Sequence, residues 1–420
     1  MKNNYTVHIK NILKEPFLFL HIIVFIGFIF LGNQRYTWLL YDILILLILL
    51  REGIRKELFS FIRYKGLFLL VSMTIFLLYI INIGINGISV ISILKIHYYL
   101  RNAVIILYFV SALRNKKECV SSFFYAILVL TSVQFIINIP LIYNEYLLRP
   151  WDIDQHNGLF GEGAHHFAGF VWLLLLLMLL YTRKGAAFIF LGLPMMFYLS
   201  ALTSNRFFVF ALIIPFLIRF FQQVAGARRI LGSIFYVLIG IIMLQITYVS
   251  VPEVKYFVDG RLSTTYQRYV LQKGRRALRT EKLKYVLKNY DTYYFGKGSG
   301  AISEVFGFEG DRRSETHNLG RNYDPITMHD ISTIMYELGL LFYVSLILLY
   351  SLLFDSLFHT KSNLRVAIIF IATVFMTFYH LILSDPRMIY TIILFVSFFA
   401  LKKNDNISRT KHYTILLPRT

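Results

Sequence analysis

The chain has 420 residues, of which 57% are hydrophobic and 16% charged, and its mean hydropathy is +0.61. Because the apolar residues lie in long runs rather than in helical stripes, this composition excludes a soluble globular protein and indicates a polytopic membrane protein. The net charge of +20 comes without an aromatic-basic RNA motif, which argues against nucleic-acid binding, and the single cysteine, Cys119, excludes an intramolecular disulfide.

Apolar runs long enough to cross a membrane recur along the chain. A bilayer core of about 30 Å needs about 20 helical residues, because each adds about 1.5 Å. The first run lacks a small-residue cleavage site, so we expect a retained helix rather than a signal peptide. The sequence thus predicts an all-α polytopic membrane protein with about 12 transmembrane helices, at residues 16–32, 36–50, 66–85, 96–113, 119–143, 158–181, 185–203, 205–222, 230–249, 329–354, 364–383 and 387–401.

Basic residues assign a side of the membrane to the ends of these helices. Lys and Arg are concentrated in the short segments that lie inside when the N-terminus is cytoplasmic, such as REGIRKELFSFIRYK and RNKKE. Short loops obey this positive-inside rule, whereas long translocated segments largely escape it. We therefore expect both termini in the cytoplasm and four parts: helices 1–9 in 1–249, one large extracytoplasmic loop in 250–328, helices 10–12 in 329–401 and a cytoplasmic tail in 402–420.

Ionisable residues are costly inside a membrane, so each one is a candidate functional residue. His165 and His166 follow Glu162 near the external end of the sixth span, in GEGAHHFAGF. Arg206 lies where the seventh span turns into the eighth. For the two histidines, ordinary residues of the membrane interface remain an open alternative.

The predicted loop 250–328 is longer than ordinary connections, and loops of this length are usually functional or disordered. Its first half is basic and partly amphipathic, with one apolar helical face formed by Leu283, Val286, Leu287 and Tyr290. This pattern fits a helix lying on the bilayer or a lid over an anionic ligand. The following FGKGSGA, which contains Lys297, does not meet the P-loop pattern, so we expect a tight turn, or at most a backbone nest for phosphate.

The tenth span carries three ionisable residues, His329, Asp330 and Glu337. At about 100° per residue, Asp330 and Glu337 are about 20° apart in projection, whereas His329 is about 80° from Glu337. Asp330 and Glu337 thus share one face, which should border a polar cavity, with His329 at its edge. Glu337 is either a structural carboxylate paired with an arginine or a backbone amide, or a functional group.

Four segments resemble the motifs of one family, in the order in which that family carries them. MHDISTIMYELGLLFYVSLILLY is similar to its H-N-x-x-L…E-x-G-x-x-G segment, and LTSNRFFVFAL to its S-R-(T/G) helix start. GRLSTTYQRYV…YYFGKGSGA resembles its arginine-rich stretch with a G-x-G turn, and NGLFGEGAHHFAGF its G-L-F-x-x-x-N-x-x-A helix. This family is the O-antigen polymerase and O-antigen ligase superfamily of bacterial surface-polysaccharide enzymes. Asp330 stands where its asparagine is usual, and Phe342 replaces its second glycine.

The resemblance implies a GT-C-like enzyme that acts on glycans carried by polyprenyl pyrophosphate, at the outer face of the bacterial cytoplasmic membrane. In such a reaction an acceptor hydroxyl displaces pyrophosphate from the anomeric carbon. Arginine binds pyrophosphate bidentately, and the implied candidates are Arg206, Arg261 and Arg268.

A base must also orient or deprotonate the hydroxyl, and histidine is the commonest choice near neutral pH. The implied catalytic candidates are His329, Asp330 and Glu337, with Glu337 orienting His329 or an arginine. Candidate substrate contacts are His165, His166 and Lys297. The resemblance implies no metal and no other cofactor.

Among these functions we favour a polymerase that joins lipid-linked repeat units into O-antigen or capsular polysaccharide. The expected partners of the polymerase are polyprenyl-pyrophosphate-linked glycans and membrane lipids. A chain-length regulator is a further partner that the sequence leaves open, and no nucleic acid is expected. The alternatives are a ligase that transfers finished glycan to lipid A core, a transporter or flippase for lipid-linked sugars, and a non-catalytic scaffold. A transporter should show an internal repeat and polar helices through the midplane, whereas polarity here gathers at one face.

Overall fold

The computed structural model describes residues 8–180 and 330–415 with short gaps, residues 294–298, and isolated positions between 194 and 259. The predicted spans at 185–203, 205–222 and 230–249 lie outside the described residues, apart from those isolated positions. Within the described part nearly every residue is helical. This part of the chain is therefore an all-α protein.

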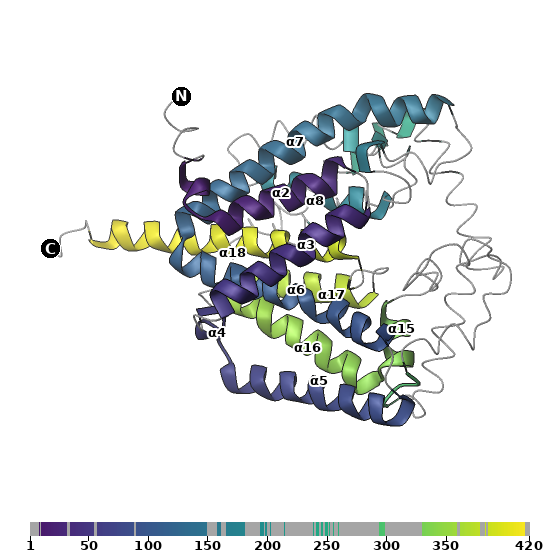
Figure 1. The fold of residues 1–420 in the computed structure, drawn as a ribbon. Helices are drawn as coiled ribbons and strands as arrows, with labels where there is room; N and C mark the ends of the chain where they lie inside the picture. Colours follow the sequence, from purple (N-terminus) through teal and green to yellow (C-terminus); the bar gives the residue numbers. More distant parts are fainter. Residues whose placement is uncertain are drawn as a thin grey trace.

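Each predicted span within the described residues overlaps a helix (Figure 1). Proline begins α2 and α18, where its fixed φ suits the first helical position and its missing N–H has no helical partner to lose. The N-terminal helices are α2 (Pro16–Phe30), α3 (Gln34–Ile48), α5 (Lys65–Asn86), α6 (Val90–Asn115), α7 (Lys117–Leu148) and α8 (His165–Leu180). The C-terminal helices are α15 (Asp330–Glu337), α16 (Leu340–Leu357), α17 (Asn363–Phe378) and α18 (Pro386–Ile415). Short connecting elements are η1 (Leu49–Gly53), α4 (Glu57–Ser60) and η3 (Gly158–Phe160).

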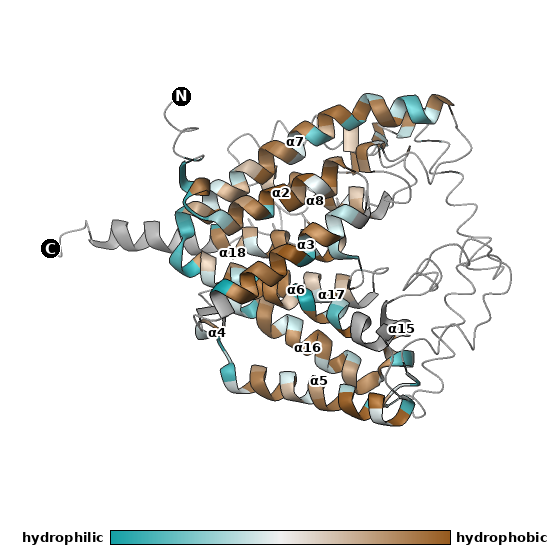
Figure 2. Cartoon of the chain, in the orientation of Figure 1, coloured by the Kyte–Doolittle hydropathy of each residue, from teal (hydrophilic) through white to brown (hydrophobic). Residues whose placement is uncertain are grey.

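The described helices have the length and surface of membrane helices. Four are long and apolar enough to cross a bilayer, namely Lys65–Asn86, Ile96–Asn115, Lys117–Leu148 and Leu340–Leu357. Apolar residues cover most of the length of these helices (Figure 2). Helix α5 exposes a continuous apolar face formed by Leu69, Leu70, Met73, Phe76 and Leu77. Because lipid solvates such a surface and water does not, these helices indicate a membrane protein.

An aromatic cluster fixes the N-terminal helices to α18. The ring of Tyr390 in α18 stacks on His21 of α2 and packs edge-on against Tyr41 of α3. His21 Nδ1 and the Tyr390 hydroxyl are hydrogen-bonded at 2.9 Å. Between helices in lipid the hydrophobic effect provides little attraction, so such ring packing and hydrogen bonds must hold them together.

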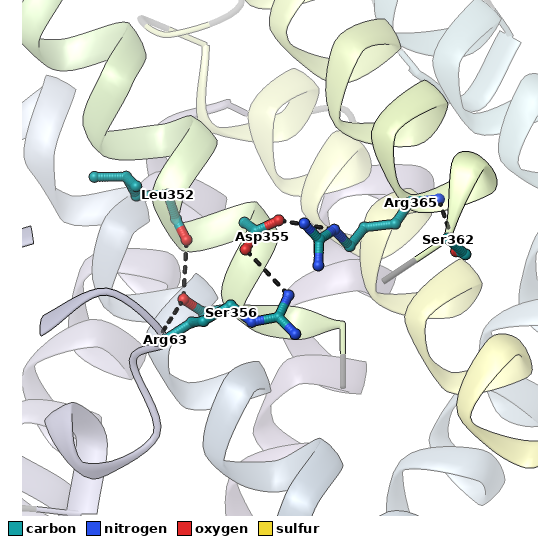
Figure 3. Close-up of polar contacts among 6 residues, drawn as sticks. All are labelled: Arg63, Leu352, Asp355, Ser356, Ser362 and Arg365. Atoms are coloured by element: carbon teal, nitrogen blue, oxygen red, sulfur yellow. Dashed lines mark hydrogen bonds and ion pairs between the residues drawn. The ribbon is translucent and has the colours of Figure 1, made fainter. Parts of the chain in front are cut away.

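The two ends of the helix bundle differ in what they contain. The start of α2, α4 and the C-terminal part of α18 lie at one end, and α15 lies at the opposite end (Figure 1). At the first end, Asp355 pairs with Arg63 at 3.4 Å and with Arg365 at 2.9 Å (Figure 3). Lys116 Nζ lies 2.6 Å from a nearly buried Glu15 carboxylate at the start of α2. The positive-inside rule expects such basic residues at the cytoplasmic end.

The tenth predicted span, 329–354, is not a single helix as the sequence predicted. Helix α15 ends at Glu337, and α16 begins at Leu340. Between them Gly339 has a φ of 100°, which only glycine adopts without steric cost. The prediction failed because the apolar pattern continues through the break without interruption.

We predict that reporter fusions after Lys116 and Lys402 are cytoplasmic and that a fusion after Lys297 is external, because Lys116 and Lys402 lie among the basic residues of one end. Paired fusions to alkaline phosphatase and green fluorescent protein measure the two locations. A phosphatase-active fusion after Lys116 would contradict this orientation.

Candidate functional site

Because of the break between α15 and α16, the last main-chain carbonyls of α15 lack an N–H donor within the helix. Leu338 N and Gly339 N both donate to Ile334 O, at 2.8 and 3.0 Å. The last carbonyls of a helix have no partner within it. Those of Tyr336 and Glu337 are therefore available to another segment.

Residues 294–298 are that segment, and we call them the docked turn. Lys297 N donates to Tyr336 O at 2.8 Å, and Gly298 N donates to Glu337 O at 3.0 Å. These two amides are thus used to bind α15, which agrees with the tight-turn interpretation of FGKGSGA. The Lys297 side chain itself is exposed. The structure thereby joins two motifs, the glycine turn and Glu337, that lie about 40 residues apart in the chain.

Glycine allows the docked turn to approach the break closely. Gly296 has a φ of 77°, and a Cβ at this position would collide with the Glu337 carbonyl. A Cβ on Gly339 would collide with the Tyr294 carbonyl in the same way. Two main-chain segments therefore pass each other with no side chain between them, which only glycine permits.

Asn82 of α5 joins the docked turn to the break. Its Nδ2 donates to Phe295 O at 2.6 Å and to Glu337 O at 2.9 Å, and the residue is only 1% exposed. One turn later, Asn86 Nδ2 donates to Asn82 O at 3.0 Å and reaches Gly296 O at 3.5 Å. One carboxamide thus satisfies two buried carbonyls from segments far apart in sequence.

Glu337 is the ionisable group at the centre of this junction. It is 1% exposed and is the last residue of α15. A group held in such a position is a candidate functional residue. Asp330 begins the same eight-residue helix, which confirms that the two acidic residues belong to one helix.

Of the remaining predicted site residues, the structure places some and not others. His165 and His166 are the first two residues of α8, and the part of the chain described includes their backbone only. Outside the described residues lie His329, Arg206, Arg261 and Arg268.

A second glycine turn is held in the same manner as the docked turn. Gly158 N donates to Glu145 Oε2 at 2.9 Å, and Leu159 N donates to Asn138 Oδ1 at 2.8 Å. Gly158 has a φ of 55°, and a Cβ there would collide with the Asn138 carboxamide. Neither Asn82 nor Asn138 was predicted from the sequence. The available signal was an asparagine within each of the apolar runs YIINIGIN and FIINIP.

An ion pair between α3 and α6 was also missed. Arg101 Nη1 donates to Asp42 Oδ1 at 2.8 Å, and the guanidinium lies 4.7 Å from the Tyr98 ring centre. His97 Nε2 lies 3.4 Å from the same Asp42 oxygen. Opposite charges in two predicted spans, 36–50 and 96–113, were the signal that could have revealed this pair.

Within the described residues, no group of three or more His, Cys, Asp or Glu side chains is arranged to hold a metal ion. No family model matches the chain, and a search of curated proteins finds no match. The geometry of the site and its sequence motifs therefore carry the functional argument.

We predict that Asn82→Ala loosens the docked turn, because Phe295 O loses its side-chain donor and Glu337 O keeps only Gly298 N. An unsatisfied buried group costs about 1–3 kcal/mol, so the melting temperature should fall and limited proteolysis within 294–298 should accelerate. Asn86→Ala is the matched control, since Asn86 is exposed and its contact with the turn is long. Equal proteolysis of the two variants would contradict the role of Asn82.

A second prediction concerns the close approach at Gly296. Gly296→Ala should destabilise the protein by about 2 kcal/mol or more, because the new Cβ adopts a disfavoured φ and meets the Glu337 carbonyl. Gly84→Ala, in α5 with open space around it, should instead stabilise by about 0.5–1 kcal/mol. Thermal unfolding in detergent compares the variants, and shifts in the same direction would refute the argument.

Proposed function

We propose that this protein polymerises polyprenyl-pyrophosphate-linked oligosaccharide repeat units at the outer face of the bacterial cytoplasmic membrane. One observation carries the proposal: the docked turn is bonded to the main chain at Glu337 and passes close to Gly339, within the segment that resembles the E-x-G motif. The polar segment that precedes this turn contains Arg261 and Arg268. Main-chain hydrogen bonds thus tie a cation-rich segment to the helix that carries the buried acid.

In the proposed reaction, the acceptor hydroxyl attacks the anomeric carbon and pyrophosphate leaves with the polyprenyl carrier. The guanidinium groups of Arg206, Arg261 and Arg268 neutralise the charge that grows on the leaving pyrophosphate. His329 accepts the hydroxyl proton. It directly precedes α15 in the sequence.

Glu337 acts in this scheme as a positioning residue. Glu337 is the last residue of an eight-residue helix, and its main-chain carbonyl accepts Gly298 N of the docked turn and Asn82 Nδ2, which fix that end. A fixed α15 holds the backbone of Asp330, its first residue, in one defined place. Such precision matters, because a displacement of about 1 Å can reduce a rate about 100-fold.

The overall arrangement supports chemistry outside the membrane. Both ends of the described chain lie at the end of the bundle with the Asp355 and Glu15 ion pairs, which we assign to the cytoplasm. The docked turn and α15 lie at the opposite end (Figure 1). Lys297, His165 and His166 belong to that external end as proposed substrate contacts.

We predict that deletion of the gene leaves single repeat units on the final acceptor and removes the ladder of longer chains. His329→Ala should give the same pattern at normal protein level, because loss of a general base slows transfer about 100-fold or more. Glu145→Gln is the matched control: it keeps an acceptor for Gly158 N and should leave the ladder intact. Gel electrophoresis of the extracted polysaccharide measures chain length.

Two outcomes would contradict the polymerase. Long polymer that accumulates on the polyprenyl carrier, with none on the final acceptor, identifies a ligase. Repeat units that remain on the cytoplasmic face identify a transporter.

A further inference from the structure

Two ionisable side chains of α3 and α6, Asp42 and His97, are covered only in part by the chain, and we call them the polar pair. The side chain of Asp42 is 33% exposed and that of His97 is 45% exposed. His97 Nε2 and Asp42 Oδ1 are 3.4 Å apart, which is longer than an ordinary hydrogen bond. Asp42 Oδ2 makes no hydrogen bond with any residue that the structure describes. The polar pair therefore has hydrogen-bonding capacity left over.

The polar pair lies near the middle of the helices around it. Asp42 is the ninth of the 15 residues of α3. Two residues after His97, the carbonyl of Tyr99 accepts the hydroxyl of Tyr350, which is the eleventh of the 18 residues of α16. Helix α16 is one of those long and apolar enough to cross a membrane. The polar pair thus lies at the depth of the hydrocarbon rather than of the lipid head groups.

The surface of α3 around Asp42 is otherwise apolar. Leu39 and Leu46 lie three and four residues from Asp42, on the same side of the helix, and both are exposed. Helix α3 runs along the near side of the bundle, and its surface there is mostly hydrophobic (Figures 1 and 2). Ionisable residues in membrane helices almost always face protein or a water-filled cavity, because hydrocarbon solvates them poorly. This face of α3 is therefore suited to contact with another protein helix.

The buried ion pair with Arg101 does not account for the exposed polar pair. Arg101 has a fully buried side chain, its Nη1 donates to Asp42 Oδ1 at 2.8 Å, and its guanidinium lies beside the rings of Trp38 and Tyr98. This bond joins α3 to α6 from inside the bundle and fixes the Asp42 carboxylate through one oxygen. Asp42 Oδ2 and the His97 ring remain for a group that approaches from outside the bundle.

Symmetry makes a second copy of this chain the fitting partner. Two copies insert in the membrane with the same orientation, so a two-fold axis that relates them runs along the membrane normal, and every residue keeps its depth. Two residues can therefore pair across that axis only if they lie at one depth. Asp42 and His97 meet this condition because they are neighbours in one chain. The carboxylate is an acceptor and the imidazole a donor, so each copy offers the group that the other lacks.

We propose that the outer face of α3, together with His97 of α6, forms the interface of a homodimer in the membrane. His97 of each copy donates to Asp42 Oδ2 of the other copy, so the same contact occurs twice. Leu39 and Leu46 pack around these contacts and exclude lipid. Polar side chains join membrane helices in this way, because the hydrophobic effect supplies little attraction between helices in lipid. The dimer does not rest on the proposed sugar transfer.

Association of full-length chains in liposomes tests the dimer. Copies labelled with donor and acceptor fluorophores are reconstituted in phosphatidylethanolamine and phosphatidylglycerol, and energy transfer is measured at several protein-to-lipid ratios. His97→Leu should weaken association about tenfold, because two equivalent contacts are lost. Thr74→Leu, which removes a polar side chain bonded within α5, is the matched control and should associate like the wild type. Transfer at the level of random proximity in the wild type, or equal association of wild type and His97→Leu, overturns the dimer.

A charge swap separates the contact from a folding defect. Asp42→His places histidine at both positions of the pair, and His97→Asp places a carboxylate at both, so each variant alone should associate weakly. In a mixture the two variants should associate with each other, because every contact again joins a histidine to an aspartate. Association in the mixture that does not exceed that of either variant alone overturns the pairing.

Disulfide cross-linking in membranes locates the interface without changing the polar pair. In a chain whose single cysteine is removed by Cys119→Ala, Leu39→Cys should give cross-linked dimers. Leu69→Cys, on α5 and equally exposed at 58%, is the matched control and should stay monomeric. Cross-linking at Leu69→Cys but not at Leu39→Cys overturns this face as the interface. None of these assays involves sugar transfer, so the dimer and the polymerase stand or fall separately.

Discussion

A main-chain group at the end of a helix inside an apolar bundle needs a new hydrogen-bond partner. The end of the bundle that contains α15 depends on how such partners are supplied. Asn82 supplies one NH₂ group to two carbonyls, Phe295 O and Glu337 O. Without Asn82, Phe295 O would lose this donor and Glu337 O would keep only Gly298 N, and a buried acceptor left unsatisfied costs about 1–3 kcal/mol. The break after Glu337 and the docked turn are therefore mutually dependent, since each supplies part of what the other lacks.

At the opposite end of the bundle, ion pairs rather than amide hydrogen bonds join the helices. Asp355 of α16 pairs with Arg63, just before α5, and with Arg365 of α17. Helix α5 is consequently held at both ends, to α16 by Arg63 at one and to the end of α15 by Asn82 at the other. In lipid the apolar middle of α5 specifies its register only weakly, because lipid tails solvate the same side chains equally well. Polar contacts at the two ends supply that register.

Hydropathy was sufficient to predict the described helices, and an ionisable residue in an apolar run was sufficient to single out Glu337. The break at Gly339 was not predictable in this way, because Leu338 and Leu340 on either side continue the apolar run. Asn82 was overlooked since an amide carries no charge and one amide hardly lowers the hydropathy of a long span. Asn82 acquires its role only through tertiary contacts with the docked turn and with Glu337, which the sequence of α5 alone does not reveal.

The arrangement of cations bears on how many lipid-linked substrates the proposed enzyme accommodates. Transfer from one polyprenyl pyrophosphate carrier to the sugar of another brings two anionic head groups to the same end of the bundle. One set of arginines cannot serve both, because two pyrophosphates at one site would repel each other strongly at low dielectric. The docked turn belongs to the predicted loop that contains Arg261 and Arg268, which are one such set of cations. A polymerase would thus need two cation sites, whereas a ligase with one lipid pyrophosphate donor would need only one.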